Sequence, residues 1–226
     1  MDKHRLFLAL WIGTIIVFIV SIFSPWWYSV EERKEDQFVE RYRSEWFLTK
    51  VSTEYESDLE PSSDWSSSYD PDEFDFPRVA ELWLRSFYIV LLGLVLNFAV
   101  LWIYLRFRQF KTTQQWVITI TALATVVTLI IPIFVTVGLP IAITNDTNYF
   151  HYPSEDAVYT SFWGEDSFSE LDGILETKYE WGPRYGWGLF WLAFVFDLSM
   201  LFIIRPPPRP TESDRTKTPA EVEVGG

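Results

Sequence analysis

The chain contains no cysteine among its 226 residues. This absence excludes disulfide bonds, thiol redox chemistry, iron–sulfur clusters and zinc sites built from thiolates. It also removes the quinone-linked disulfide-forming enzymes, otherwise a natural class for a small membrane protein. The two histidines, His4 and His151, fall on opposite sides of the membrane in the topology derived below, so a haem held by two histidines is excluded as well.

Recognisable signatures of catalysis are also missing. The sequence has no glycine-rich phosphate-binding loop and no identifiable pair of catalytic carboxylates. It also has no nucleophile at a recognisable spacing from a residue that could act as its general base. We therefore expect a protein that is not an enzyme and that needs no cofactor. A membrane enzyme that uses carboxylates outside the bilayer is a third hypothesis, because acids are abundant there, and single Asp or Glu substitutions would then abolish its activity.

Charge of one sign dominates between the apolar segments. The net charge is -13, and residues 29–80 hold fifteen acids against six bases, while residues 141–183 hold nine against one. Such a surface repels the phosphate backbone, so nucleic acid is excluded as a partner. Hydrophobic residues make up 49% of the chain and gather in four blocks, which predicts a membrane protein rather than a globular one.

The first apolar block is Leu6–Ser24, which follows the bases Lys3 and Arg5 and is closed by Trp26 and Trp27. It is long enough to cross a bilayer, and the tryptophans form an aromatic belt at the far interface. A removable signal peptide would have a shorter apolar region and would end in small residues. We therefore predict a retained membrane span.

The basic residues beside the spans fix the predicted orientation. Arg106, Arg108 and Lys111 mark a cytoplasmic connection, so both termini are predicted to be cytoplasmic, in a multi-pass protein of the plasma membrane. The third span exceeds the bilayer thickness, so it should tilt or project outward, with Pro132 and Pro140 as bend points. The predicted segments are a cytoplasmic N-terminus (1–5), a first span (6–28), an acidic, β-rich outer loop (29–81), a second span (82–105), a cytoplasmic loop (106–115), a third span (116–143), an acidic, aromatic outer loop (144–184), a fourth span (185–204) and a disordered cytoplasmic tail (205–226).

The first outer loop has the pattern of short strands. The run Trp46–Tyr55 alternates β-branched and aromatic residues with polar ones, as a half-buried strand does. From Pro61 to Pro77 the composition changes to Ser, Asp, Glu and Pro with isolated aromatics, which predicts a loop or short hairpin strands.

Two polar residues lie inside the predicted spans at one depth. Asn97 and Asp197 both fall roughly 10–12 Å above the inner face, and Thr14 and Thr121 or Thr125 fall near that level. One hypothesis is a proton or cation site at Asp197, in a small transporter or proton-coupled membrane protein. The favoured interpretation is a hydrogen bond from protonated Asp197 to Asn97 that fixes helix register, worth about 0.6 kcal/mol, because no second charged residue lies at that level. Asp197→Asn should then leave folding and function nearly intact.

A cluster of carboxylates in the first outer loop is a weak calcium candidate, since calcium prefers oxygen ligands. The spacing departs from an EF-hand loop in having no Gly at the sixth position and no Glu at the twelfth, so a solvated acidic turn is favoured and no metal is predicted. The cluster consists of Asp70, Asp72, Glu73 and Asp75.

Two further features of the second outer loop have weaker signals. His151, Glu155 and Asp156 resemble the edge of a metal-binding site in composition only. The favoured interpretation is that His151 is an isolated histidine on the surface. Asn145-Asp-Thr147 is a glycosylation sequon on the predicted outer side.

Three short stretches carry a family resemblance. Trp26 and Trp27 followed by Trp46-Phe-Leu are similar to a Trp…Gly-Leu-Trp signature, Pro77-Arg-Val-Ala80 is similar to an Ala-Arg-Ala stretch, and Tyr185-Gly-Trp-Gly-Leu-Phe-Trp191 is similar to Tyr-Gly-Trp-Ser-Phe. With the pattern of spans, these stretches resemble the superfamily of claudins, peripheral myelin protein and calcium-channel gamma subunits. The positions concerned are Trp26, Trp27, Trp46, Arg78, Tyr185, Gly186 and Trp187.

The resemblance implies a claudin-like fold, in which a left-handed, all-α four-helix membrane bundle carries a small extracellular antiparallel β-sheet. It also implies a role in adhesion, in barriers or as an auxiliary subunit. The family's paired cysteines are missing here, so packing alone would hold the first outer loop, and the second outer loop is longer than in claudins. We thus expect a structural or interaction protein in the lipid bilayer whose partner is a second copy or another membrane protein.

Overall fold

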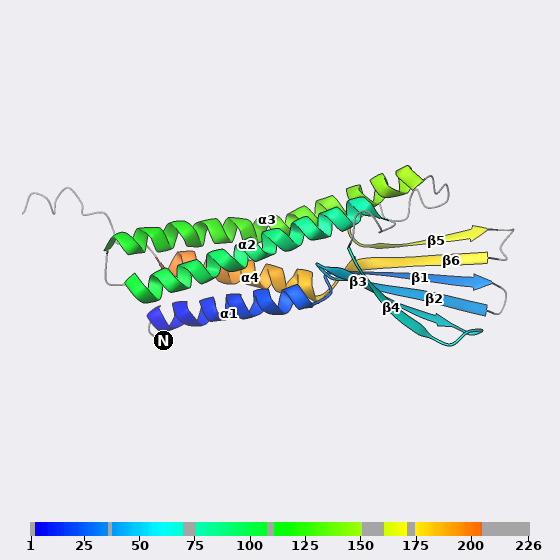
Figure 1. Cartoon of the computed structure of the whole chain (residues 1–226), viewed down its shortest axis with the longest axis horizontal. Helices are drawn as coiled ribbons and strands as arrows, with labels where there is room; N and C mark the ends of the chain where they lie inside the picture. Colours follow the sequence, from blue (N-terminus) through cyan, green and yellow to red (C-terminus); the bar gives the residue numbers. More distant parts are fainter. Residues whose placement is uncertain are drawn as a thin grey trace, which may run out of the picture.

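Four long helices lie side by side and a β-sheet extends from one end of them (Figure 1). The computed structural model describes residues 3–35, 38–69, 76–107, 111–150, 161–170 and 175–204. The helices are α1 (Lys3–Phe23), α2 (Pro77–Phe107), α3 (Lys111–Phe150) and α4 (Tyr185–Ile203). The strands are β1 (Trp27–Glu35), β2 (Phe38–Trp46), β3 (Lys50–Ser57), β4 (Ser63–Ser68), β5 (Gly164–Glu170) and β6 (Leu175–Pro183).

All four helices are long and apolar enough to cross a membrane. The candidate spans are His4–Phe23, Pro77–Arg106, Gln114–Asp146 and Tyr185–Ile203, which agree with the four blocks of the sequence. Large apolar side chains such as Ile16, Val95 and Val137 point outward from the bundle, as lipid-facing side chains do. The predicted membrane character of the chain is therefore confirmed at this level.

Two helices continue well beyond the lengths predicted for their spans. α2 begins at Pro77, whose missing N–H and fixed φ suit the first position of a helix. α3 runs from Lys111 to Phe150 with Pro132 and Pro140 inside it, so the prolines do not end the helix. As a result α3 extends past the bundle alongside the sheet (Figure 1).

The sheet is antiparallel throughout and has the order β4-β3-β2-β1-β6-β5. Its central strand, β1, pairs with β2 in the register Trp27↔Trp46 and with β6 in the register Trp27↔Pro183. Strands from the two outer loops therefore form one sheet. The paired strands β1 and β6 are also the ones that run almost directly into helices, β1 from α1 and β6 into α4.

The strand predicted across Trp46–Tyr55 is wrong in its extent. β2 ends at Trp46, a turn follows, and β3 begins at Lys50. The turn is closed by a hydrogen bond of 2.9 Å from the N–H of Phe47 to the carbonyl of Lys50, and Leu48 at its centre is fully buried. The hairpin strand predicted after Pro61 is present as β4.

The two faces of the sheet differ in chemistry, because side chains alternate along each strand and paired residues share a face. The charged face carries ion pairs such as Arg41 with Glu32. The aromatic face is covered at the helix end by Tyr69 and Phe162, which are both buried. The aromatic face consists of Trp27, Phe38, Tyr42, Trp46, Tyr55, Trp65, Tyr179 and Trp181, and the charged face includes Glu32, Arg41, Arg43, Glu45, Glu54, Lys178 and Glu180.

Candidate functional site

The junction between bundle and sheet is formed by two consecutive tryptophans. Trp26 is fully buried, donates its indole N–H to the carbonyl of Ser21 at 2.9 Å and lies 5.3 Å from the ring of Phe190. Trp27 donates its indole N–H to the carbonyl of Phe162 at 2.9 Å, and its ring meets that of Trp46 edge-on at 5.9 Å. The tryptophans predicted to be an aromatic belt are thus the core that fixes the sheet on the helices.

Gly186 allows α4 to approach this core closely. A Cβ at this position would lie 2.4 Å from Cδ1 of Trp26, so no larger residue fits beside the indole. The Gly186 carbonyl accepts a hydrogen bond of 2.9 Å from the hydroxyl of Ser21, and its N–H donates to Pro25 at 2.9 Å. Three family-like positions, Trp26, Trp27 and Gly186, therefore act together to join α1, β1 and α4.

Of the neighbouring family-like positions, Trp187 belongs to this junction and Tyr185 does not. Trp187 lies 5.7 Å from the ring of Phe162 and donates to Thr136 on α3 at 3.3 Å. Tyr185 is mostly exposed. The structure thus brings Trp187 into the junction and leaves Tyr185 at the surface of the bundle.

The turn between β2 and β3 is held by a residue that the sequence analysis missed. The hydroxyl of Tyr69 lies 2.8 Å from the carbonyl oxygen of Phe47 and 2.9 Å from that of Lys50. Burial raises the pKa of Tyr69 well above its ordinary value. This turn places the side chain of Leu48 in the larger hydrophobic core of the protein. An isolated aromatic after the serine-rich strand was the only sequence signal for Tyr69.

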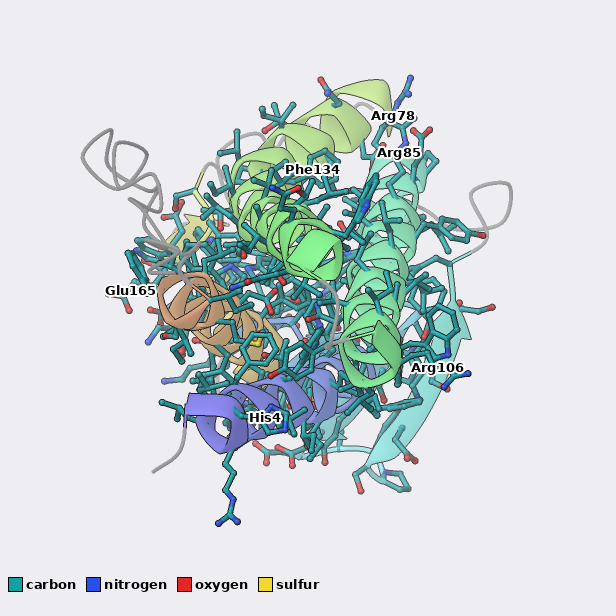
Figure 2. All side chains as sticks on the ribbon, turned by 90° about the vertical axis from the view of Figure 1, so that its left-hand side faces the viewer. His4, Arg78, Arg85, Arg106, Phe134 and Glu165 are labelled. Carbon is teal, nitrogen blue, oxygen red and sulfur yellow. The ribbon has the colours of Figure 1, made fainter. Side chains whose placement is uncertain are left out.

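The start of α2 is capped from α3. The buried carboxylate of Asp146 accepts hydrogen bonds from the backbone N–H of Arg78 at 3.0 Å and of Val79 at 2.9 Å. The side chain of Arg78 instead points outward, 3.7 Å from Glu81, which also pairs with Arg85. Figure 2 places Arg78 and Arg85 at the end of α2 away from His4 and Arg106. The family-like Arg78 therefore contributes its backbone, and Asp146 is the residue missed.

On the charged face, Arg184 connects three elements at the start of α4. Its guanidinium lies 4.5 Å over the ring of Tyr28 and 3.6 Å from Glu45. The hydroxyl of Tyr28 donates to Glu180 at 2.6 Å. Burial, and then the hydrogen bond to Glu180 and the negative charge of that residue, raise the pKa of Tyr28 to about 12.

A polar groove of about 450 Å³ lies along β2, β3 and the start of β4. Hydroxyls and carboxylates line it, without the apolar wall that pockets for small organic ligands have. We therefore assign it no ligand. Its lining residues are Arg43, Glu45, Ser52, Thr53, Glu54, Ser62, Ser63 and Asp64.

The aromatic face is open to solvent at the far end of the sheet and on its edge strand β4. Phe38 is 47% exposed and Trp65 is 49% exposed. Between them the rings of Tyr42 and Tyr55 lie 4.9 Å apart, and the guanidinium of Arg33 lies 5.8 Å over Tyr42. Unlike the part that Tyr69 and Phe162 cover, this open part of the aromatic face offers aromatic surface to a partner.

The acid predicted to pair with Asn97 forms its hydrogen bond with a threonine. Asp197 is fully buried in α4, whereas the side-chain amide of Asn97 donates within α2, to the carbonyl of Gly93 at 3.0 Å, so the bond between Asp197 and Asn97 stays a prediction. The shortest contact comes from Thr128 on α3, whose hydroxyl lies 2.7 Å from Oδ2 of Asp197. Thr14 and Thr121, expected near this level, are buried but donate within their own helices.

The remaining predicted sites have different outcomes. Asn145 is exposed on α3 beside the inward-facing Asp146, and its glycosylation stays a prediction. Within the ranges that the structure describes, no group of three metal-binding side chains is found. The calcium candidates Asp70, Asp72, Glu73 and Asp75 and the group His151, Glu155 and Asp156 lie outside the described residues.

Comparison with known proteins adds no relative. No family model matches the chain, and no curated protein matches it.

Proposed function

We propose that the chain is a structural or interaction protein of the plasma membrane whose sheet binds a protein partner outside the cell. The observation that carries this proposal is the open part of the aromatic face, with Phe38 and Trp65 about half exposed. Tyr and Trp are enriched at the centres of protein interfaces, where they bury much area at low entropic cost. Arg33 and its partner Glu31 supply a polar rim beside these rings.

The arrangement of the junction supports membership of the claudin-like superfamily. The residues that carried the resemblance are far apart in sequence, yet Trp26, Trp46 and Gly186 all lie where the sheet meets the bundle. The four helices and the antiparallel sheet also support it, because the resemblance implies a bundle that carries such a sheet. Membership makes adhesion, barrier formation or an auxiliary-subunit role the specific form of the interaction.

The distribution of charge supports an orientation with both termini inside. His4 and Arg106 lie at the end of the bundle opposite the sheet (Figure 2), and the acidic loops lie at the sheet end. Basic residues favour the cytoplasmic side of a membrane. The sheet is then extracellular, and the aromatic face is available to partners in the same or an opposing membrane.

The test compares complexes recovered when the tagged full chain is gently solubilised from its native membrane. We expect the wild-type chain to emerge with a second copy or another membrane protein in fixed ratio, and the variant Phe38→Ser/Trp65→Ser to lose it. Leu59→Ser is the matched control, because Leu59 is 63% exposed and lies outside the sheet faces. A wild-type monomer, or a complex that survives the double variant, contradicts the proposal.

The buried acid supports a second candidate function, transport of protons or cations past Asp197. The specific observation is that Oδ1 of Asp197 is buried and has no hydrogen-bond partner among the described residues. Proton and cation flux into vesicles that contain the reconstituted protein distinguishes the two functions. A flux that Asp197→Asn abolishes would support transport. An unchanged complex in the same variant is expected from the first function.

A further inference from the structure

The surroundings of Asp197 contain an imbalance between hydrogens and acceptors. The hydroxyl oxygen of Thr128 lies 2.7 Å from Oδ2 of Asp197 and 2.7 Å from the carbonyl oxygen of Ala124. Both distances are typical of O–H···O hydrogen bonds. A threonine hydroxyl has one hydrogen, and neither a carbonyl nor an ionised carboxylate can donate one. With Asp197 ionised, one of these two contacts would place oxygen atoms together without a hydrogen.

Adding one proton resolves the imbalance. A carboxylic acid at Oδ2 donates to Thr128, and Thr128 then donates to Ala124, so each 2.7 Å contact has its hydrogen. Without a proton on Asp197, buried oxygen atoms of α3 and α4 would face each other unsatisfied, which is costly where water cannot reach.

The helices packed around Asp197 provide no counter-ion. No Asp, Glu, Lys, Arg or His occurs in residues 6–23 of α1, 86–105 of α2 or 112–145 of α3. In α4, Asp197 is the one residue of these five types. The other titratable side chains in these ranges and in α4 are Tyr88 and Tyr185, which are exposed, and Tyr104, which pairs with His4 at the end opposite the sheet. An unpaired carboxylate among apolar side chains in a membrane is expensive.

We propose that Asp197 is a proton-binding site, occupied in the folded protein, whose proton links α4 to α3 through Thr128. When the site is occupied, the Oδ2–H bond is formed and the chain Asp197–Thr128–Ala124 is complete. When the proton leaves to water, the Thr128 hydrogen has to turn from Ala124 to Oδ2, and the carboxylate is left without a counter-ion. The inference does not depend on the binding proposed for the sheet.

The experiment is infrared spectroscopy of the purified full chain in lipid bilayers at neutral pH. We expect a carboxylic acid C=O band that shifts on exchange into heavy water and disappears in Asp197→Asn. Thr128→Val removes the acceptor of the acid proton, so the band should move to higher wavenumber. Absence of any acid band that Asp197→Asn removes would overturn the proposal.

Thr121→Val is the matched control for the threonine substitution. Thr121 is buried in the same helix, but its hydroxyl donates to the carbonyl of Val117 at 2.7 Å within α3. The band should therefore keep its position in Thr121→Val. Equal shifts in the two threonine variants would contradict the link through Thr128, and this comparison needs no substitution of Asp197 itself.

Discussion

The substitution Gly186→Ala tests whether close contact between α4 and Trp26 holds the sheet on the bundle. The added methyl carbon would lie 2.4 Å from Cδ1 and 2.6 Å from Nε1 of Trp26, and 3.0 Å from the carbonyl oxygen of Ser24. Carbon atoms at van der Waals contact are about 3.5–4.0 Å apart, so the indole has to move by about 1 Å or more. Trp26 is fully buried, and its N–H bond to Ser21 fixes it in place.

The expected effect combines three terms. Overpacking a well-packed core costs about 1–3 kcal/mol. Weakening the buried hydrogen bond of the Trp26 indole costs about 1 kcal/mol. Replacing glycine by alanine in a helix returns about 1 kcal/mol. Gly186→Ala should therefore lower the free energy of unfolding by about 1–3 kcal/mol.

Gly188→Ala is the matched control, two residues further along α4. A Cβ at Gly188 has no atom within 4 Å, so the substitution should be neutral or stabilising by about 0.5–1 kcal/mol. The assay is thermal and denaturant unfolding of both variants in detergent, followed by tryptophan fluorescence and circular dichroism. Equal stability of the two alanine variants would refute the argument that Gly186 is required by the contact with Trp26.

Three further perturbations test other parts of the junction. Asp146→Ala removes the cap of α2 and should cost about 1–3 kcal/mol, with faster hydrogen exchange of the first α2 amides, whereas Asn145→Ala next to it should change neither. Leu48→Ala should lower the free energy of unfolding by about 2–5 kcal/mol, while Leu59→Ala at the exposed hairpin should leave it nearly unchanged. The raised pKa of Tyr28 means that the fold favours the neutral phenol, so its contribution to stability is present below pH 10 and is lost as pH rises toward 12. An ultraviolet titration in which Tyr28→Phe removes no late-titrating tyrosinate would contradict this assignment.

The helices could be predicted from the sequence because the signal for a membrane span is local. A continuous apolar run of sufficient length identifies a span without knowledge of its neighbours. The cap of α2 could not be predicted in this way. Asp146 and Arg78 are 68 residues apart, and nothing in either segment indicates that the carboxylate turns inward to the backbone of the other.

The sheet shows a second limit of local patterns. Alternation indicated strand-forming residues between Trp46 and Tyr55, but it did not reveal that Leu48 marks a turn. The pairing of β1 with β6 joins Trp27 to Pro183, so it depends on how α1 and α4 pack rather than on either strand alone.

The intramembrane site was found in part for a similar reason. Counting residues along each helix gives depth, and depth brought Asn97 and Asp197 to one level. Which threonine faces the acid depends on helix rotation, which is set by packing. Thr128 faces Asp197, whereas Thr121 turns its hydroxyl back to its own helix.

The direct continuity of β1 and β6 with helices has a mechanical consequence. Three residues separate α1 from β1, and one residue separates β6 from α4. A pull on the far tip of the sheet would load β1 and β6 along their length and pass through these short connections into α1 and α4. The edge strands β4 and β5 are the ones next in sequence to α2 and α3. Force on the sheet would therefore reach α1 and α4 through shorter connections than α2 and α3.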